Sequence, residues 1–155
     1  LVERAGNNQQ GSITAIYTIL VEGDDLDDPI ADASRAILDG HIVLSRKLAD
    51  EGVFPAIDVG ASISRAMVSL VDDSHYAGLQ VIKEHIATYH ANRDLITIGA
   101  YQRGSDPRID AAIAAYPQIM ELLRQPIGSA ISMADSLSAL LSLTHPESQR
   151  ADAHA

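Results

Sequence analysis

The sequence contains no cysteine and no tryptophan, and phenylalanine occurs once among 155 residues. The absence of cysteine excludes disulfide bonds, thiolate metal sites, iron–sulfur clusters and cysteine nucleophiles, and it suits a reducing cytosol. Aromatic residues make up only 4% of the chain, whereas hydrophobic residues make up 46%. We therefore expect a folded protein whose core is built from aliphatic side chains and alanine.

Positive charge is scarce, and so are long hydrophobic runs. Lys and Arg number 11 against 21 Asp and Glu, which gives a formal net charge of −10 and argues against nucleic acid as a partner. The two lysines, Lys47 and Lys83, do not end a G-x-x-x-x-G-K-[ST] loop, so a phosphate cradle of that type is absent. No hydrophobic run reaches the roughly 18–20 residues of a membrane span, and we expect no signal peptide.

The first 70 residues alternate between strand-like and helix-like segments. Residues 12–21 are rich in Ile, Tyr, Thr and Val, which predicts a buried strand. Residues 30–39 predict a short helix that Gly40 stops, as a glycine commonly does one position after a helix end. A strand over 41–44, a helix over 46–51 capped by Ser45, and an extended segment over 53–58 follow. This alternation predicts part of an α/β domain, which we place at residues 1–70.

From residue 71 onward the pattern becomes helical and predicts an all-α domain over 71–155. Asp72, Asp73 and Ser74 form an N-cap cluster before apolar residues at helical spacing. Those apolar residues are Leu79, Ile82, Ile86 and Tyr89. A second helix is expected from Pro107 to Arg124 and a third from Met133 to Leu143.

Few residues suggest independent chemistry. His85 and His90 are five positions apart, no two histidines are spaced i, i+4, and we expect no metal site. No serine lies in a G-x-S-x-G motif, and we expect Ser62 and Ser64 to cap a helix. The acidic run over 22–32 lacks the EF-hand frame, which leaves a solvated turn or a protein-contact loop.

Arg65 has two open interpretations. In the first, its guanidinium pairs with a nearby carboxylate such as that of Asp58. In the second, it projects from the edge of the α/β part toward a phosphate, for which a permanently charged, bidentate donor is well suited.

Six strings in order resemble the type III protein-export ATPases, most closely the flagellar branch, which are similar to the catalytic β subunit of the rotary ATP synthase. The resemblance runs from Leu1 to about Ile127. It implies the end of a P-loop, RecA-like nucleotide-binding α/β domain followed by an all-α C-terminal domain, with the P-loop and Walker B aspartate upstream of Leu1. The strings are LVERAG, GSIT, EGDDLDDPIAD, ILDGHIVLSRKLA, FPAIDVGASISRAM and IGAYQRGSDPRIDAAI.

The resemblance also implies roles for individual residues. Arg65 matches the arginine finger that acts on a neighbouring subunit's nucleotide. Phe54, which precedes Pro55, matches the aromatic residue that stacks on adenine, and Leu122 and Ile127 match the second wall of that pocket. The family's stalk-contacting positions correspond to five residues of this chain. They are Asp24, Asp25 and Asp28 in the acidic loop and Arg103 and Asp106 at the tip of the helical domain.

The resemblance further implies ATP and Mg²⁺ as ligands, bound mainly by residues upstream of this segment. It implies a homohexamer in the cytoplasm at the base of the flagellar export apparatus, in contact with central and peripheral stalk proteins, export chaperones with their substrates and the membrane export gate. Without its P-loop this segment alone is predicted to be inactive. Three alternatives remain: a virulence injectisome ATPase, a non-catalytic module that binds chaperones or a stalk, and an acidic domain of unrelated role.

Overall fold

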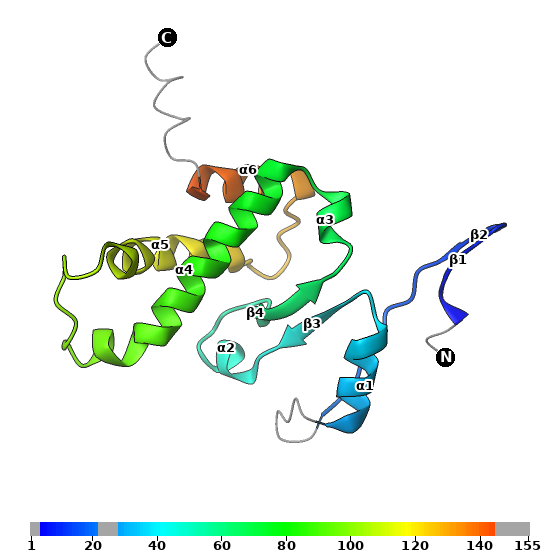
Figure 1. Ribbon diagram of the computed structural model, residues 1–155, viewed down its shortest axis with the longest axis horizontal. Helices are drawn as coiled ribbons and strands as arrows, with labels where there is room; N and C mark the ends of the chain where they lie inside the picture. The colour runs from blue at the N-terminus through cyan, green and yellow to red at the C-terminus, as the bar shows by residue number, and fades with distance from the viewer. Residues whose placement is uncertain (1–3, 22–27, 145–155) are drawn as a thin grey trace, which may run out of the picture.

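The computed structural model describes residues 4–21 and 28–144 (Figure 1). All strands of this part precede Arg65, and the residues after it form helices and connecting loops. Asp24, Asp25 and the segment after Thr144 lie outside the described residues. The elements are β1 (Gly6–Asn8), β2 (Gly11–Ile13), α1 (Pro29–Ile37), β3 (Gly40–Leu44), α2 (Arg46–Asp50), β4 (Ile57–Ser64), α3 (Met67–Leu70), α4 (Asp73–Thr97), α5 (Pro107–Leu123) and α6 (Met133–Thr144).

The buried strand predicted over residues 12–21 is wrong in this structure. Only its first two residues belong to a strand, β2, which pairs with β1 in a small antiparallel hairpin. Residues 14–21 have no strand partner in the described part of the chain, and Ile16 and Leu20 are 94% and 93% exposed. A β-rich composition reports a tendency to pair, but a strand forms only where a neighbour supplies hydrogen bonds and covers its side chains.

The strands β3 and β4 form the second antiparallel pair, and its register is interrupted. His41 pairs with Ile63 but Val43 pairs with Asp58, so residues 59–62 bulge out of the ladder. Ser62 bridges the gap: its hydroxyl donates to the Asp58 carbonyl at 2.6 Å and accepts from the Val43 N–H at 3.0 Å. Ser62 and Ser64 therefore do not cap a helix as predicted, because the segment is extended in β4.

The predicted helices begin within one residue of their expected positions, and a side chain caps four of them. Asp28 caps α1 with Pro29 in its first turn, Ser45 caps α2, Asp72 caps α4 and Asp106 caps α5 ahead of Pro107. The short helix α3 was not predicted. Gly40 does not end α1, since the helix stops at Ile37 and Gly40 already belongs to β3.

The helices α4, α5 and α6 pack against one another around a small aliphatic core (Figure 1). Its buried members are Ile82 and Ile86 of α4 and Ile119 of α5, the last only 1% exposed. No helix in residues 4–21 and 28–144 is long and apolar enough to span a bilayer.

Candidate functional site

Arg65 follows β4 directly and lies at the C-terminal end of α1. Its guanidinium donates Nη2–H to the Arg35 carbonyl at 3.2 Å and Nη1–H to the Ala36 carbonyl at 3.3 Å. Its own backbone N–H donates to the Asp39 carbonyl at 2.8 Å, and its side chain stays exposed. The predicted pairing with Asp58 does not occur, since the Asp58 carboxylate instead accepts the Ala61 N–H at 2.9 Å within the bulge.

The loop that holds Phe54 meets the loop that follows α5. The backbone N–H of Gln125 donates to the Phe54 carbonyl at 2.8 Å, and the Phe54–Pro55 peptide bond is cis. The Phe54 side chain is half-exposed and that of Ile127 fully exposed, so both offer apolar surface at this junction. Leu122 instead packs against the core of the helical part. The structure thus brings the two expected adenine-facing segments together, with Phe54 and Ile127 as their open members.

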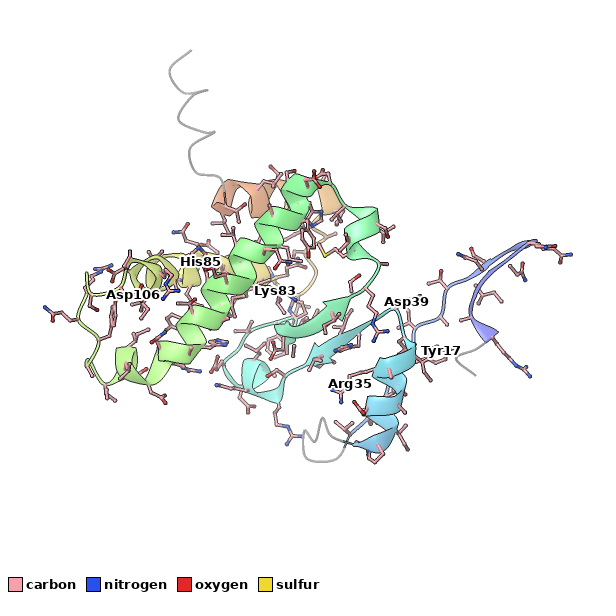
Figure 2. The ribbon with its side chains drawn as sticks, in the orientation of Figure 1. Tyr17, Arg35, Asp39, Lys83, His85 and Asp106 are labelled. Atoms are coloured by element: carbon pink, nitrogen blue, oxygen red, sulfur yellow. The ribbon has the colours of Figure 1, made fainter. Side chains whose placement is uncertain are left out.

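The two expected stalk-facing regions lie at different places in the molecule. Asp28 ends the acidic loop, and its carboxylate accepts the N–H groups of Ile30 and Ala31 at 2.9 and 3.0 Å. The turn between α4 and α5 carries the exposed side chain of Arg103 and the capping carboxylate of Asp106, labelled in Figure 2. The Arg108 backbone N–H that Asp106 accepts is the main reason why the pKa of this carboxyl is lowered.

The turn itself is organised by Asp110. Its Oδ2 accepts the Gly104 N–H at 2.8 Å, and its Oδ1 lies 3.1 Å from the Tyr101 hydroxyl. Gly104 adopts a φ of +91°, which favours glycine, so glycine suits the backbone of this turn.

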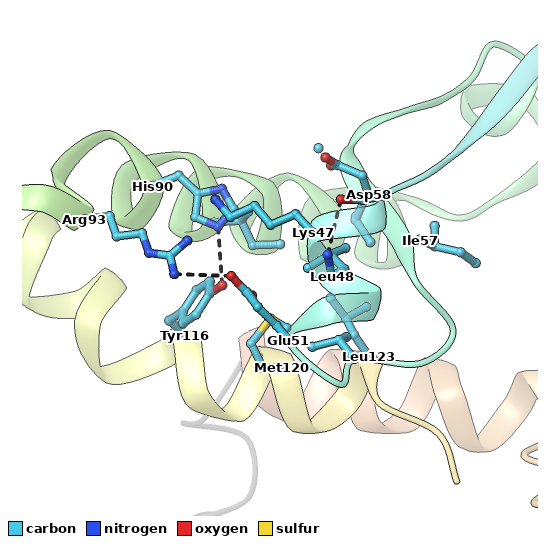
Figure 3. A pocket seen from close by; sticks show the side chains of 15 residues that line it. Lys47, Leu48, Glu51, Ile57, Asp58, His90, Arg93, Tyr116, Met120 and Leu123 are labelled. Atoms are coloured by element: carbon cyan, nitrogen blue, oxygen red, sulfur yellow. Dashed lines mark hydrogen bonds and ion pairs between the residues drawn. The ribbon is translucent and has the colours of Figure 1, made fainter. Parts of the chain in front are cut away.

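A pocket of about 160 Å³ lies between the strand-containing part and the helical part (Figure 3). Its apolar lining comes from both parts: Leu48, Val53, Ile57, Ile86, Met120 and Leu123. Across its rim Arg93 of α4 pairs with Glu51, which follows α2, at 3.3 Å. His90 Nε2 lies 3.3 Å from the Tyr116 hydroxyl, and Tyr116 stacks on Tyr89 with ring centroids 3.8 Å apart. Burial is the main cause that raises the pKa of the Tyr116 hydroxyl, and the nearby Tyr89 and Glu51 raise this pKa further.

Sequence reasoning missed this pocket because its partners are far apart in the chain. Glu51 and Arg93 are separated by 42 residues, and nothing in either local pattern marks them as a pair. A second bond crosses the same boundary: Lys83 of α4, labelled in Figure 2, donates its ammonium to the Ser62 carbonyl at 3.2 Å. The described residues contain no group of three His, Asp or Glu side chains suited to a metal ion.

Two family models match separate parts of the chain. Residues 1–64 match the nucleotide-binding domain of the ATP synthase alpha/beta family. Residues 71–142 match the C-terminal domain of the type III secretion system ATPase EscN. The fold and these matches define the class: the end of an ATP-synthase-type nucleotide-binding domain, followed by a secretion-ATPase C-terminal domain.

Relatives and solved structures agree with this class. The chain is 56% identical over 142 residues to the flagellum-specific ATP synthase of Salmonella typhimurium, covering 90% of the chain and 31% of that protein. It is 46% identical over 144 residues to the type 3 secretion system ATPase of Pseudomonas savastanoi pv. phaseolicola, covering 93% of the chain and 32% of that protein. The assembled EscN of enteropathogenic E. coli superposes with a TM-score of 0.87 at 45% identity, covering 92% of the chain and 35% of EscN. Over nine tenths of its length the chain is similar to type III secretion ATPases of the ATP synthase alpha/beta family, and it spans about a third of the length of the curated relatives it matches.

Proposed function

We propose that this chain is the C-terminal part of an ATP-hydrolysing type III secretion ATPase that drives export of flagellar proteins. The flagellar branch is favoured because the flagellum-specific relatives of Salmonella, Pseudomonas aeruginosa and Bacillus subtilis are 56%, 53% and 49% identical to the chain. The secretion-system ATPase of P. savastanoi is 46% identical. The injectisome branch is the second candidate, and complementation of an export-deficient flagellar strain, tested against an injectisome mutant, distinguishes them.

The observation that carries the proposal is the setting of Arg65. An exposed guanidinium is held at the edge of the α/β part by backbone carbonyls, and no carboxylate among residues 4–21 and 28–144 pairs with it. Such a group is available to neutralise developing charge on a phosphoryl group bound by a neighbouring subunit. Arg65 is therefore the arginine finger of the proposed enzyme.

The residues present also suit part of a nucleotide site. Half-exposed Phe54 and exposed Ile127 offer apolar surface on two loops tied by the Gln125–Phe54 hydrogen bond, as an adenine ring requires. When bound, ATP with Mg²⁺ supplies the phosphoryl group that is transferred. The described residues hold no carboxylate or histidine cluster suited to Mg²⁺. Following the resemblance, the proposal assigns the phosphates and the metal mainly to residues upstream of this segment in the full-length protein.

The assembly belongs to the same proposal. EscN has been described in an assembled form and in complex with its central stalk EscO, and the chain superposes on one chain of that complex with a TM-score of 0.80. We take the full protein to be a homohexamer in the cytoplasm at the base of the export apparatus. In this proposal its stalk contacts the acidic-loop residues Asp24, Asp25 and Asp28 and the residues Arg103 and Asp106 of the turn before α5. Peripheral stalk proteins, chaperone–substrate complexes and the membrane export gate complete the set of partners.

The test is the Arg65→Ala variant of the full-length protein. We expect kcat for ATP hydrolysis to fall by about three orders of magnitude or more, because a finger acts only at the transition state, while nucleotide affinity stays within a few fold. Arg65→Lys keeps the charge but not the bidentate geometry, and it should recover only part of the activity.

One control accompanies this test, and two outcomes would contradict the proposal. The chain of residues 1–155 alone, which has no G-x-x-x-x-G-K-[ST] loop, is expected to give no turnover. Unchanged turnover in Arg65→Ala would refute the finger. Stalk binding by a full-length protein that hydrolyses no ATP would instead support the non-catalytic binding module.

A further inference from the structure

The C-terminal end of α1 is closed by a residue from a distant part of the chain. The last carbonyls of a helix have no partners within it and must bond elsewhere. In α1 the carbonyls of Arg35 and Ala36 accept from the Arg65 guanidinium, and the Asp39 carbonyl, just beyond the helix, accepts from the Arg65 N–H. Figure 2 labels Arg35 and Asp39 at this end of α1. Arg65 is therefore positioned by α1 as much as by β4.

This contact holds the Arg65 guanidinium in place and leaves some of its N–H donors available. The C-terminal end of a helix carries partial negative charge, which attracts a cation. A guanidinium has five N–H donors, and two of them bond to α1. The other three have no partner among residues 4–21 and 28–144, and the side chain is exposed. The guanidinium can keep its place on α1 and still bind an anion.

The opposite end of α1 is tied to the acidic loop. Asp28, the first described residue after that loop, caps the helix through the N–H groups of Ile30 and Ala31. Within the helix, Asp32 and Arg35 form an ion pair of 3.5 Å. Nine helical residues span about 13 Å at 1.5 Å per residue, so α1 is a short rod between the acidic loop and Arg65.

We propose that α1 is the positioning element of the finger, so that its last carbonyls hold the Arg65 guanidinium in the pose that reaches a phosphate. This inference rests on the proposed function.

The test loosens α1 without touching Arg65 or the acidic loop. Ala33 is an exposed residue in the middle of α1, and Ala33→Gly lowers helix propensity there. The matched control is Ala87→Gly, the same change at an exposed position of α4. Ala33→Gln, which restores a good helix former, is the rescue variant. All are made in the full-length enzyme, with thermal unfolding measured alongside.

We expect Ala33→Gly to lower kcat roughly 2- to 30-fold with KM for ATP unchanged, as for mutations that weaken coupling between sites. The kcat values of Ala87→Gly and Ala33→Gln should stay within about twofold of the wild-type kcat. In an Arg65→Ala background Ala33→Gly should cause no further loss, because both changes act through one guanidinium.

Two results would overturn the positioning role. Equal kcat for Ala33→Gly and Ala87→Gly would show that α1 does not position Arg65. A higher kcat for Ala33→Gly would show that α1 restrains an inactive pose. The proposed function fails separately: if Arg65→Ala leaves turnover unchanged, Arg65 is no finger and the positioning role falls with it.

Discussion

Gly40 lies where the backbone of β3 packs tightly against that of β4. It pairs with Ser64, the residue before Arg65, and a Cβ at this position would lie 2.7 Å from the Ile63 carbonyl oxygen. The atom in the way belongs to the backbone, so the clash could be relieved only by moving a strand. The sequence suggested a helix-ending glycine, whereas the structure shows a glycine required by strand packing.

Gly40→Ala should therefore destabilise the protein. Overpacking of this kind reduces the free energy of unfolding by about 1–3 kcal/mol, measurable by urea denaturation followed by circular dichroism. The control is Gly60→Ala, whose new Cβ would meet only the Asp58 side chain at 3.3 Å. Equal effects of the two substitutions would argue against a tight contact at Gly40.

Among the elements, the long helix α4 depends on a titratable cap. The Asp72 carboxylate accepts from the Ser74 hydroxyl at 2.6 Å and from the His75 N–H at 2.8 Å. These bonds, the one from Ser74 first, favour the charged form and lower the pKa of Asp72. A carboxyl whose pKa is lowered by folding stabilises the protein above its unfolded pKa of about 3.9, and this contribution is lost as the pH falls through the lower folded value.

Asp72→Asn should therefore make the stability of the protein less dependent on pH in the acid range. Asparagine still caps a helix but does not titrate in this range, so the drop in Tm between about pH 5 and pH 2 should be smaller than in the wild type. Asp94→Asn, in the last turn of the same helix, serves as a control with the same change of charge. A wild-type drop that Asp72→Asn does not reduce would contradict the role of Asp72.

Across the whole molecule, the strand-containing and helical parts meet around the pocket of about 160 Å³ and through a few polar bonds. The Glu51–Arg93 ion pair, the Lys83–Ser62 bond and the Gln125–Phe54 bond all cross this boundary. The side chains of Arg93 and Glu51 are 41% and 36% exposed, so water and salt screen their attraction. We therefore expect apolar packing around the pocket to contribute more than this ion pair to the free energy that holds the two parts together.

A double-mutant cycle on Glu51→Gln and Arg93→Gln measures the free energy of the interaction between these two side chains. We expect a coupling free energy below about 1 kcal/mol, reduced further at about 1 M salt. Urea denaturation of the four proteins provides the values. A coupling above about 2 kcal/mol that is insensitive to salt would mean that the pair is desolvated and is the main bond between the two parts.

The sequence by itself determined where the main helices begin and what fills the core. Asp28, Ser45, Asp72 and Asp106 each cap a helix through an N–H group two or three residues away, so the information is local. The apolar spacing that includes Ile82 and Ile86 identified the buried face of α4 in the same way. The residues expected at the nucleotide and the stalk followed from a resemblance, and their roles stay predictions.

Only the tertiary structure decided which distant groups meet. Arg65 bonds to carbonyls of α1 that lie about thirty residues earlier in the sequence, although Asp58 is nearer in the sequence. Ser62 bridges a break in the pairing of β3 and β4, and residues 14–21 form no strand. These outcomes depend on how the chain closes on itself: a side chain bonds to whichever unsatisfied group folding brings within reach, and a strand needs a partner. Neither condition is encoded by the residues on either side.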